Sequence, residues 1–148
     1  MVNKINKSHN VSHLLYHLVC PAKYRRLVFR DIPMVDKAIK DVCVEIQKRY
    51  DIFFVEIGID GDHVHFLIQS VPGISPSKIA QIVKSITARE VFKKVPEVKT
   101  MLWGGEFWTK GYYVNTVGYS GNKEEIVKYI RNQDSEYQQI YSQQTKLF

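Results

Sequence analysis

Two histidines separated by a single valine, His63-Val64-His65, lie in an apolar segment with the residue types of a β-strand. Side chains alternate between the two faces of a strand, so both imidazoles leave on the same face, about 6–7 Å apart. Neutral imidazole is a common metal ligand, and this spacing suits one divalent ion. Taken alone, such a pair is more often structural or solvated, so its meaning depends on the rest of the chain.

Matching chemistry lies far downstream, at Tyr129 and Gln133. Residues four apart on a helix share a face, with about 6 Å between their Cβ atoms, so a hydroxyl and an amide are presented together. The alternative is that Tyr129 joins Ile126 and Ile130 on an apolar stripe that packs into the core. Gln133 interrupts that stripe, which keeps the functional interpretation open.

Length and composition predict one soluble domain spanning residues 1–148. A chain of this size can bury a core without disulfides or metals. No segment offers the ~18–20 consecutive apolar residues that cross a membrane. Residues 1–10 are polar and basic and lack the apolar stretch of a secretory signal, so we expect a cytoplasmic protein. Cys20 and Cys43 are accordingly expected to be reduced thiols.

The formal net charge is +6 and the isoelectric point is near 9.3. Such a balance favours an anionic partner, and nucleic acid is the usual one for a small basic protein. The basic turn Lys23-Tyr24-Arg25-Arg26 follows the first predicted strand and is a candidate phosphate contact.

The elements that must position these side chains follow from hydrophobic periodicity and turn residues. We predict strands at residues 11–19, 52–59, 63–71 and 111–117, helices at 32–50 and 75–94, a linker at 118–121, and a last helix from Asn122. Asp60 and Asp62 are assigned to the hairpin turn before the histidines, in preference to a supporting role at a metal. The order β-α-β-β-α-β-α predicts an α+β fold: a ferredoxin-like antiparallel sheet with helices on one face, plus a C-terminal helix that carries the tyrosine.

Together these segments resemble the HUH endonucleases, and among them the single-tyrosine transposases of insertion sequences that move as single-stranded DNA. The His63-Val64-His65 strand resembles the metal motif of that family. Residues 103–118 resemble the segment before its last helix, and residues 129–133 resemble its tyrosine helix. The early residues 21–26 fit as well.

The resemblance implies that Tyr129 is the nucleophile and that His63, His65 and Gln133 bind the metal, which is Mg²⁺ or Mn²⁺ in the family. It also implies a covalent 5′-phosphotyrosine intermediate, a leaving 3′-OH, and later transfer of the strand to another 3′-OH without ATP. This agrees with what the residues require, because tyrosine ordinarily loses its proton near pH 10 and needs a base or a nearby cation to attack a phosphodiester.

The family acts on single-stranded DNA with hairpins and works as a homodimer whose active sites can combine residues of both subunits. The resemblance therefore implies these partners for this chain. Candidate contacts to the DNA backbone are Lys23, Arg25, Arg26 and Lys84, and candidate stacking residues are Trp108 and Tyr112.

Several alternatives remain at this stage. A histidine-triad hydrolase needs a third alternating histidine where this chain has Leu67, and a two-histidine phosphoesterase needs H-x-T. A domesticated HUH nuclease that cuts repetitive hairpins shares the same chemistry. A non-catalytic, basic ferredoxin-like nucleic-acid-binding module would explain the fold and charge and leave the histidines and Gln133 as coincidence.

Overall fold

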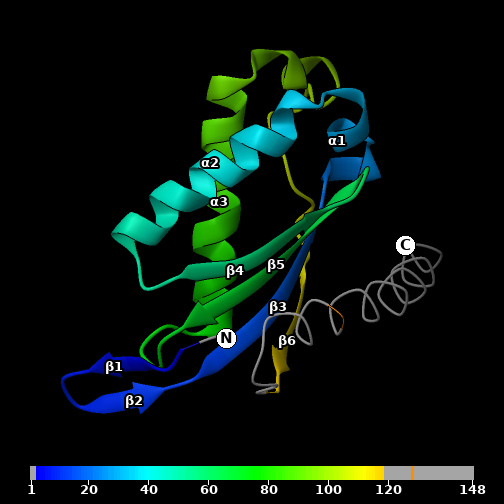
Figure 1. Ribbon diagram of the computed structural model, residues 1–148. Coiled ribbons are helices and arrows are strands. Elements are labelled where there is room, and N and C mark those ends of the chain that lie inside the picture. Colours follow the sequence, from blue (N-terminus) through cyan, green and yellow to red (C-terminus); the bar gives the residue numbers. More distant parts are fainter. Residues whose placement is uncertain (1–2, 119–127, 129–148) are drawn as a thin grey trace.

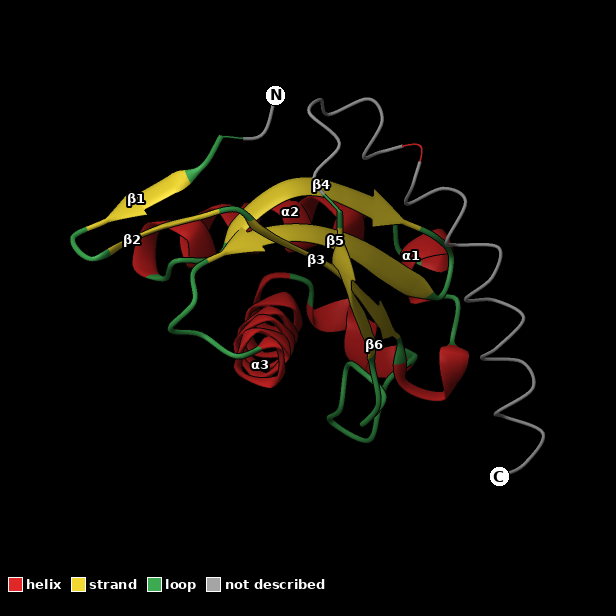
Figure 2. Ribbon diagram, turned by 90° about the horizontal axis from the view of Figure 1, so that it is seen from below, coloured by secondary structure: helices red, strands yellow, loops and turns green. Residues whose placement is uncertain are grey.

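The protein is described by a computed structural model that covers residues 3–118 and Lys128 (Figure 1). Its centre is an antiparallel sheet of four strands in the order β4-β5-β3-β6. These strands are β3 (Leu14–Pro21), β4 (Phe53–Ile59), β5 (His63–Ser70) and β6 (Tyr113–Val117). Figure 2 shows β5 and β3 lying between the two outer strands, so the histidine strand is central.

Two long helices make the crossover connections. Helix α2 (Met34–Arg49) links β3 to β4, and α3 (Pro76–Lys94) links β5 to β6. Because β5 pairs between β3 and β4, each β-α-β unit is split by an inserted strand, as in ferredoxin-like folds. Both helices lie on one side of the sheet (Figure 1). The predicted fold class is confirmed for the described residues.

The long helices begin and end close to where the sequence predicts. Ser75 is the N-cap of α3, where its hydroxyl accepts a hydrogen bond from the Lys78 amide at 3.1 Å. Pro76 follows at the first helical turn, where its missing amide hydrogen costs no hydrogen bond. Ile79, Val83 and Ile86 then form the buried stripe that holds α3 to the sheet.

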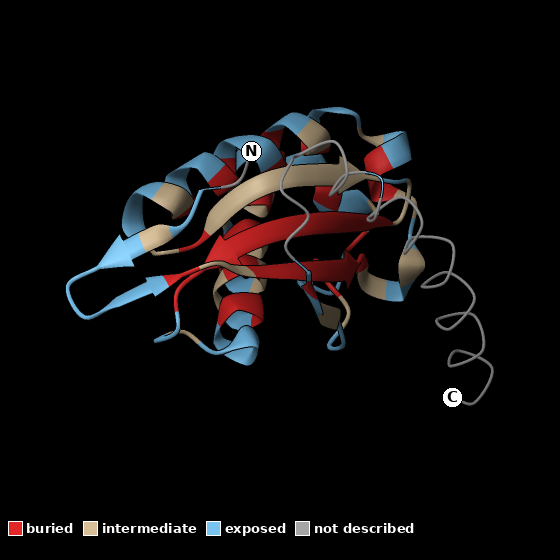
Figure 3. Ribbon diagram, turned by 60° about the horizontal axis from the view of Figure 1, so that its bottom comes forward, coloured by how far each residue is buried: buried red, intermediate tan, exposed pale blue. Residues whose placement is uncertain are grey.

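The two faces of the sheet differ in chemistry. Alternate residues Tyr16, Leu18 and Cys20 of β3 and Val64, Phe66 and Ile68 of β5 point toward the helices and belong to the main core. The opposite face carries His17, His63 and His65, with a small apolar cluster of Leu15, Leu67 and Val117 beside them. Figure 3 shows that β3 and β5 are buried along almost their whole length. The period of two therefore separates packing from chemistry within the same strands.

The N-terminal part differs from the prediction of one strand at residues 11–19. Strands β1 (Ile5–Lys7) and β2 (Asn10–Ser12) form a separate hairpin, and β3 starts at Leu14. The hairpin is mostly exposed and polar, so its sequence lacks the alternation of apolar residues that predicts a strand. The Lys7 ammonium lies 2.9 Å from the Asp51 carboxylate, which ties the hairpin to the residues before β4.

The structure also contains three short helical segments that the hydrophobic periodicity did not predict: η1 (Lys23–Arg25), α1 (Val28–Asp31) and η2 (Pro96–Thr100). Each has five residues or fewer, which is too short to show a helical repeat. None of the described helices is long and apolar enough to cross a membrane. The predicted linker at 118–121, apart from Gly118, and the predicted last helix lie outside the described residues, except for Lys128.

Both cysteines are free and buried in the main core. Burial raises the pKa of the Cys20 thiol to about 12, and it also raises the pKa of Cys43. Neither thiol is therefore ionised near neutral pH, and neither is a candidate nucleophile.

Replacing Thr87 by valine tests how α3 is joined to the segment before β6. The buried Trp108 indole donates a 2.9 Å hydrogen bond to the Thr87 hydroxyl. Valine keeps the shape of threonine but leaves that indole N–H unpaired, which costs about 1–3 kcal/mol. We expect Thr87→Val to lower the free energy of unfolding by that amount in urea titrations. Thr100→Val, at an exposed position, should change it by less than about 0.5 kcal/mol.

Candidate active site

The turn between β4 and β5 carries the residues that begin the site. The Asp60 amide donates a 2.9 Å hydrogen bond to the His63 carbonyl, which closes the turn. Neighbouring backbone also holds the turn. The Ala22 amide donates to the Asp62 carbonyl at 2.8 Å, and the Phe29 amide donates to the Gly61 carbonyl at 3.2 Å. A Cβ on Gly61 would lie 3.1 Å from the Leu27 side chain, so glycine permits this close approach. Backbone hydrogen bonds thus fix the position of the turn.

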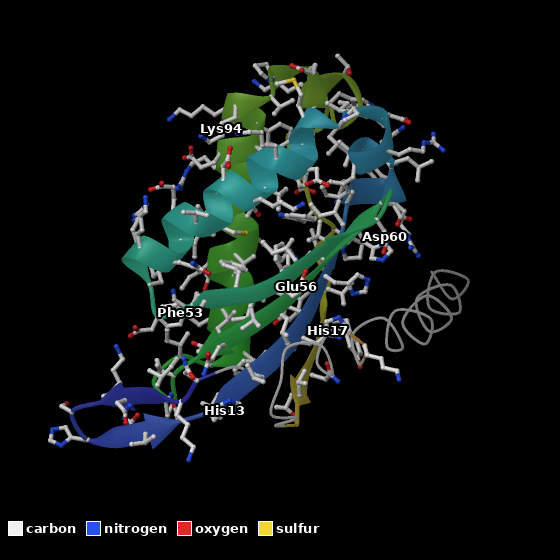
Figure 4. All side chains as sticks on the ribbon, in the orientation of Figure 1. His13, His17, Phe53, Glu56, Asp60 and Lys94 are labelled. Atoms are coloured by element: carbon white, nitrogen blue, oxygen red, sulfur yellow. The ribbon has the colours of Figure 1, made fainter. Side chains whose placement is uncertain are left out.

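Three ligand-type atoms converge beside this turn. His63 Nε2 lies 3.0 Å from His65 Nε2, and Asp60 Oδ2 lies 3.1 Å from the first and 3.7 Å from the second. Both imidazoles are buried, at 1% and 4% exposure, whereas Asp60 is exposed. Figure 4 shows Asp60 at the end of the β4–β5 hairpin, and His63 and His65 follow at the start of β5.

Asp62 sets the protonation of His63. Its Oδ1 lies 2.6 Å from His63 Nδ1, and its Oδ2 accepts a 2.9 Å hydrogen bond from Arg25 Nε. Burial by itself raises the pKa of the Asp62 carboxyl, but the hydrogen bonds from His63 and Arg25 outweigh that effect and hold the pKa below its ordinary value. An ionised Asp62 can only accept, so His63 donates from Nδ1, and the lone pair of the neutral ring is on Nε2.

His65 is supported from the neighbouring strand. His17 Nε2 lies 2.9 Å from His65 Nδ1, and the two rings are stacked with centroids 5.1 Å apart. The register explains the contact: His17 is paired with Leu67 and His65 with Val19, so the histidines meet diagonally across β3 and β5. If His65 donates from Nδ1 to His17, its own Nε2 is also left with a lone pair facing His63.

The donor set therefore fits a divalent cation. Two imidazole nitrogens and a carboxylate oxygen lie within 3.7 Å of one another, an arrangement that a positive ion stabilises. Neighbouring ligands of an octahedral ion with bonds of about 2.0–2.2 Å stand roughly 2.8–3.1 Å apart, and two of the three separations match. Each histidine also has the second hydrogen bond that orients metal-binding imidazoles.

Asp60 is a functional candidate for which the sequence favoured a turn position over a supporting role at a metal. It does close the turn, yet its carboxylate also meets both imidazoles. Asp62 likewise combines a turn position with the support of His63. Two aspartates flanking a tight turn directly before H-x-H were the available signal. Tyr129 and Gln133, the predicted nucleophile and third ligand, lie outside the described residues.

The four residues predicted to contact the DNA backbone lie in different environments. Arg25 faces Asp62, where it stabilises the site, and Lys23 forms a 2.6 Å ion pair with Glu106. Arg26 is exposed on the same turn. The Lys84 ammonium donates to the Thr109 and Lys110 carbonyls at 2.8 and 3.0 Å. Lys84 thus fastens the segment before β6, a structural role that the sequence did not indicate.

The predicted stacking residues also differ from one another. Trp108 is only 6% exposed and is hydrogen-bonded to Thr87, so its burial argues against a base-stacking role. Tyr112 is partly exposed, with the Lys84 ammonium 5.4 Å from its ring centroid. The aromatic ring that made Trp108 a stacking candidate lies in the core beside Phe29 and Phe107.

Removing the Asp60 carboxylate tests whether it belongs to a metal site. Asp60→Asn keeps the size and the backbone turn but removes the negative charge that faces the two imidazoles. We expect Mn²⁺ affinity, measured by calorimetry or by the loss of the free-ion electron paramagnetic resonance signal, to fall by roughly 10–100-fold.

Asp51→Asn is the matched control, because Asp51 pairs with Lys7 at the far end of β4 and should leave Mn²⁺ affinity unchanged. Equal affinities of Asp60→Asn and the parent protein would remove Asp60 from the ligand set.

Comparison with known proteins identifies the family of this chain. The family model described as IS200-like transposase matches residues 10–133. The ISDra2 transposase TnpA of Deinococcus radiodurans is 31% identical over 123 residues, which are 83% of this chain and 86% of that protein. The transposase of insertion sequence IS200 from Salmonella typhimurium is 29% identical over 118 residues, which are 80% of this chain and 75% of that one.

A crystal structure from Deinococcus radiodurans, of a protein described as a transposase, is similar in fold. The TM-score is 0.69 at 29% identity, and the match covers 87% of this chain and 97% of that one. The family match includes the hairpin with Asp60, His63 and His65 and extends through Tyr129 and Gln133. The chain therefore belongs to the IS200-like transposases, a family of enzymes that cut and rejoin DNA.

Proposed function

We propose that this transposase cuts and rejoins single-stranded DNA at hairpin-marked element ends through a covalent 5′-phosphotyrosine. The observation that carries the proposal is the convergence of His63 Nε2, His65 Nε2 and Asp60 Oδ2. A binding module has no need for two buried imidazoles whose lone pairs meet a carboxylate. A metal-assisted phosphoryl transferase does, since it must neutralise charge at the reacting phosphate.

In the proposed reaction the Tyr129 phenolic oxygen attacks the scissile phosphorus. A bond forms between that oxygen and phosphorus while the bond from phosphorus to the 3′-oxygen breaks. The tyrosine gives up its proton, and the departing strand takes one to leave as a free 3′-OH. Attack by a 3′-OH of another strand reverses these bonds and restores the tyrosine. Because the phosphodiester energy is kept in the enzyme–DNA bond, no nucleotide cofactor is needed.

The chain's own residues prepare this step. His63 and His65 would hold a divalent cation, with Asp60 and, by the family resemblance, Gln133 completing the set. When bound, that cation supplies positive charge that polarises the scissile phosphate. Asp62, itself held by Arg25, fixes the His63 ring, and His17 supports the His65 ring. The role of these supporting residues is to hold the Nε2 atoms of His63 and His65 in position before the DNA binds.

We infer Mg²⁺ or Mn²⁺ as the working metal. A carboxylate beside two imidazoles accepts either ion, and Mn²⁺ tolerates nitrogen ligands better than Mg²⁺ does. Imidazoles intrinsically prefer later transition metals, so availability in the cell decides the choice.

We also propose that the protein works as a homodimer in which one subunit's histidines can be combined with the partner subunit's tyrosine helix. The support is the family resemblance.

Replacing Tyr129 by phenylalanine tests the covalent step. Labelled single-stranded hairpin DNA from the element's own flanks, incubated with the protein and Mn²⁺, should yield a protein–DNA adduct that survives denaturing electrophoresis. Tyr129→Phe lacks the attacking oxygen, so the adduct should fall by roughly a thousandfold or more, and chelator should abolish it in the parent protein.

Tyr137→Phe is the control, because Tyr137 is a second tyrosine of the same C-terminal region and should leave adduct formation intact. Tight DNA binding with no adduct on several flanking substrates would contradict the transposase chemistry and favour the binding module.

A further inference from the structure

Two large aromatic side chains stand outside the core beside the turn that supplies Arg25. Tyr24 is 70% exposed and Trp103 is 75% exposed. Both line one shallow hollow of about 50 Å³, together with Lys23, Arg26 and Glu106. Single exposed apolar residues are ordinary, but two exposed rings at one hollow with cationic neighbours form a patch that packing does not require.

The backbone of this turn is strained in a way that separates neighbouring side chains. Tyr24 and Arg25 have φ angles of 56° and 52°, in the left-handed region that residues with a Cβ rarely adopt. The conformation is held by the Arg25 amide, which donates to the Ala22 carbonyl at 2.8 Å. As a result the Arg25 side chain reaches Asp62 while the Tyr24 ring remains in solvent. Strain of this kind is common where a loop serves a binding site.

The segment that carries Trp103 is tied to the turn that carries Tyr24 by contacts between the two loops. The Lys23 amide donates to the Phe107 carbonyl at 2.8 Å, and the Lys23 ammonium pairs with Glu106. Gly105 takes a φ of 80° in the turn that carries Trp103, a conformation that suits glycine. The hollow is therefore built from two segments that are tied together, although they are about 80 residues apart.

The charge of the patch favours an anionic occupant. Lys23 is matched by Glu106, but Arg26 is exposed and its guanidinium lies 5.9 Å from the Tyr24 ring centroid. Within the described part of the chain, no carboxylate lies within ion-pair distance of Arg26. The Lys23 ammonium also lies 5.2 Å from the Tyr24 ring centroid. Exposed rings beside cationic groups are a combination that binds single-stranded nucleic acid without sequence readout.

We propose that Tyr24 and Trp103 form a stacking platform for unpaired bases of the DNA strand at the active site, with Arg26 meeting its phosphates. This deepens the proposed function and rests on it. Within a duplex, neighbouring base pairs cover the base faces, so a flat exposed ring finds its stacking partners among unpaired bases. The hollow is too small to enclose a base, so stacking occurs on its surface. The platform adjoins the chemistry because the next residue, Arg25, contacts Asp62, which holds His63.

Binding of short oligothymidylate and of an abasic strand of equal length tests the platform. Stacking needs bases, whereas phosphate contacts do not. We expect Trp103→Ala and Tyr24→Ala each to weaken oligothymidylate binding about five- to tenfold in fluorescence anisotropy, and to leave the abasic strand within twofold of the parent protein. Trp103→Phe and Tyr24→Phe, which keep a ring, should retain most of the affinity, and Met34→Ala, at a similarly exposed side chain, should have no effect.

Indole fluorescence gives a second readout. Oligothymidylate should quench the emission of the parent protein, and the quenching should be lost in Trp103→Phe, where the buried Trp108 remains as the tryptophan.

Unchanged oligothymidylate affinity in both alanine variants, with hairpin adduct still formed by the parent protein, would overturn the platform and leave the proposed function standing. A change of oligomeric state in those variants without loss of DNA affinity would overturn it in favour of a protein contact. A parent protein that neither binds the strand nor forms the adduct would overturn both proposals.

Discussion

The close approach of two imidazole nitrogens and a carboxylate oxygen is the constraint on which the rest of this structure depends. His63 Nε2, His65 Nε2 and Asp60 Oδ2 would repel one another unless a cation joined them or a proton were shared among them. Holding them together requires a rigid support. The central place of β5, the tight turn before it, and the outer contacts of Asp62 and His17 provide that support.

The fold explains why such a site is available on a small domain. Two helices cover one face of the sheet and bury its apolar residues, which leaves the other face for chemistry. In the same two strands, alternate residues are apolar toward the helices, whereas the opposite face carries His17, His63 and His65 beside a small apolar cluster. Stability and function therefore use different side chains of the same strands, so the site does not have to interrupt the core.

The turn at residues 23–26 joins several parts of the molecule. It places Arg25 against Asp62, ties the segment before β6 through Lys23, and leaves Tyr24 and Arg26 exposed. A strained backbone at two successive residues makes this division possible, because neighbouring side chains must point in very different directions. Lys84 acts in a similar way from α3, where its ammonium binds the carbonyls of the segment that leads into β6.

The sequence by itself determined the class of fold, the long helices and the pair of histidines on one face, because all of these follow from local periodicity. The period of two put His63 and His65 together, and the period of 3.6 with the Ser75 cap located α3.

Only the tertiary structure decided which residues surround the two histidines. Asp60 meets the histidines because a turn reverses the chain, His17 reaches His65 through strand register, and Arg25 arrives from a loop some 40 residues away. Trp108 is buried, which argues against a contact with DNA bases, whereas Tyr24 is exposed on a strained loop. Such contacts join residues that are distant along the chain, and no pattern within a segment encodes them.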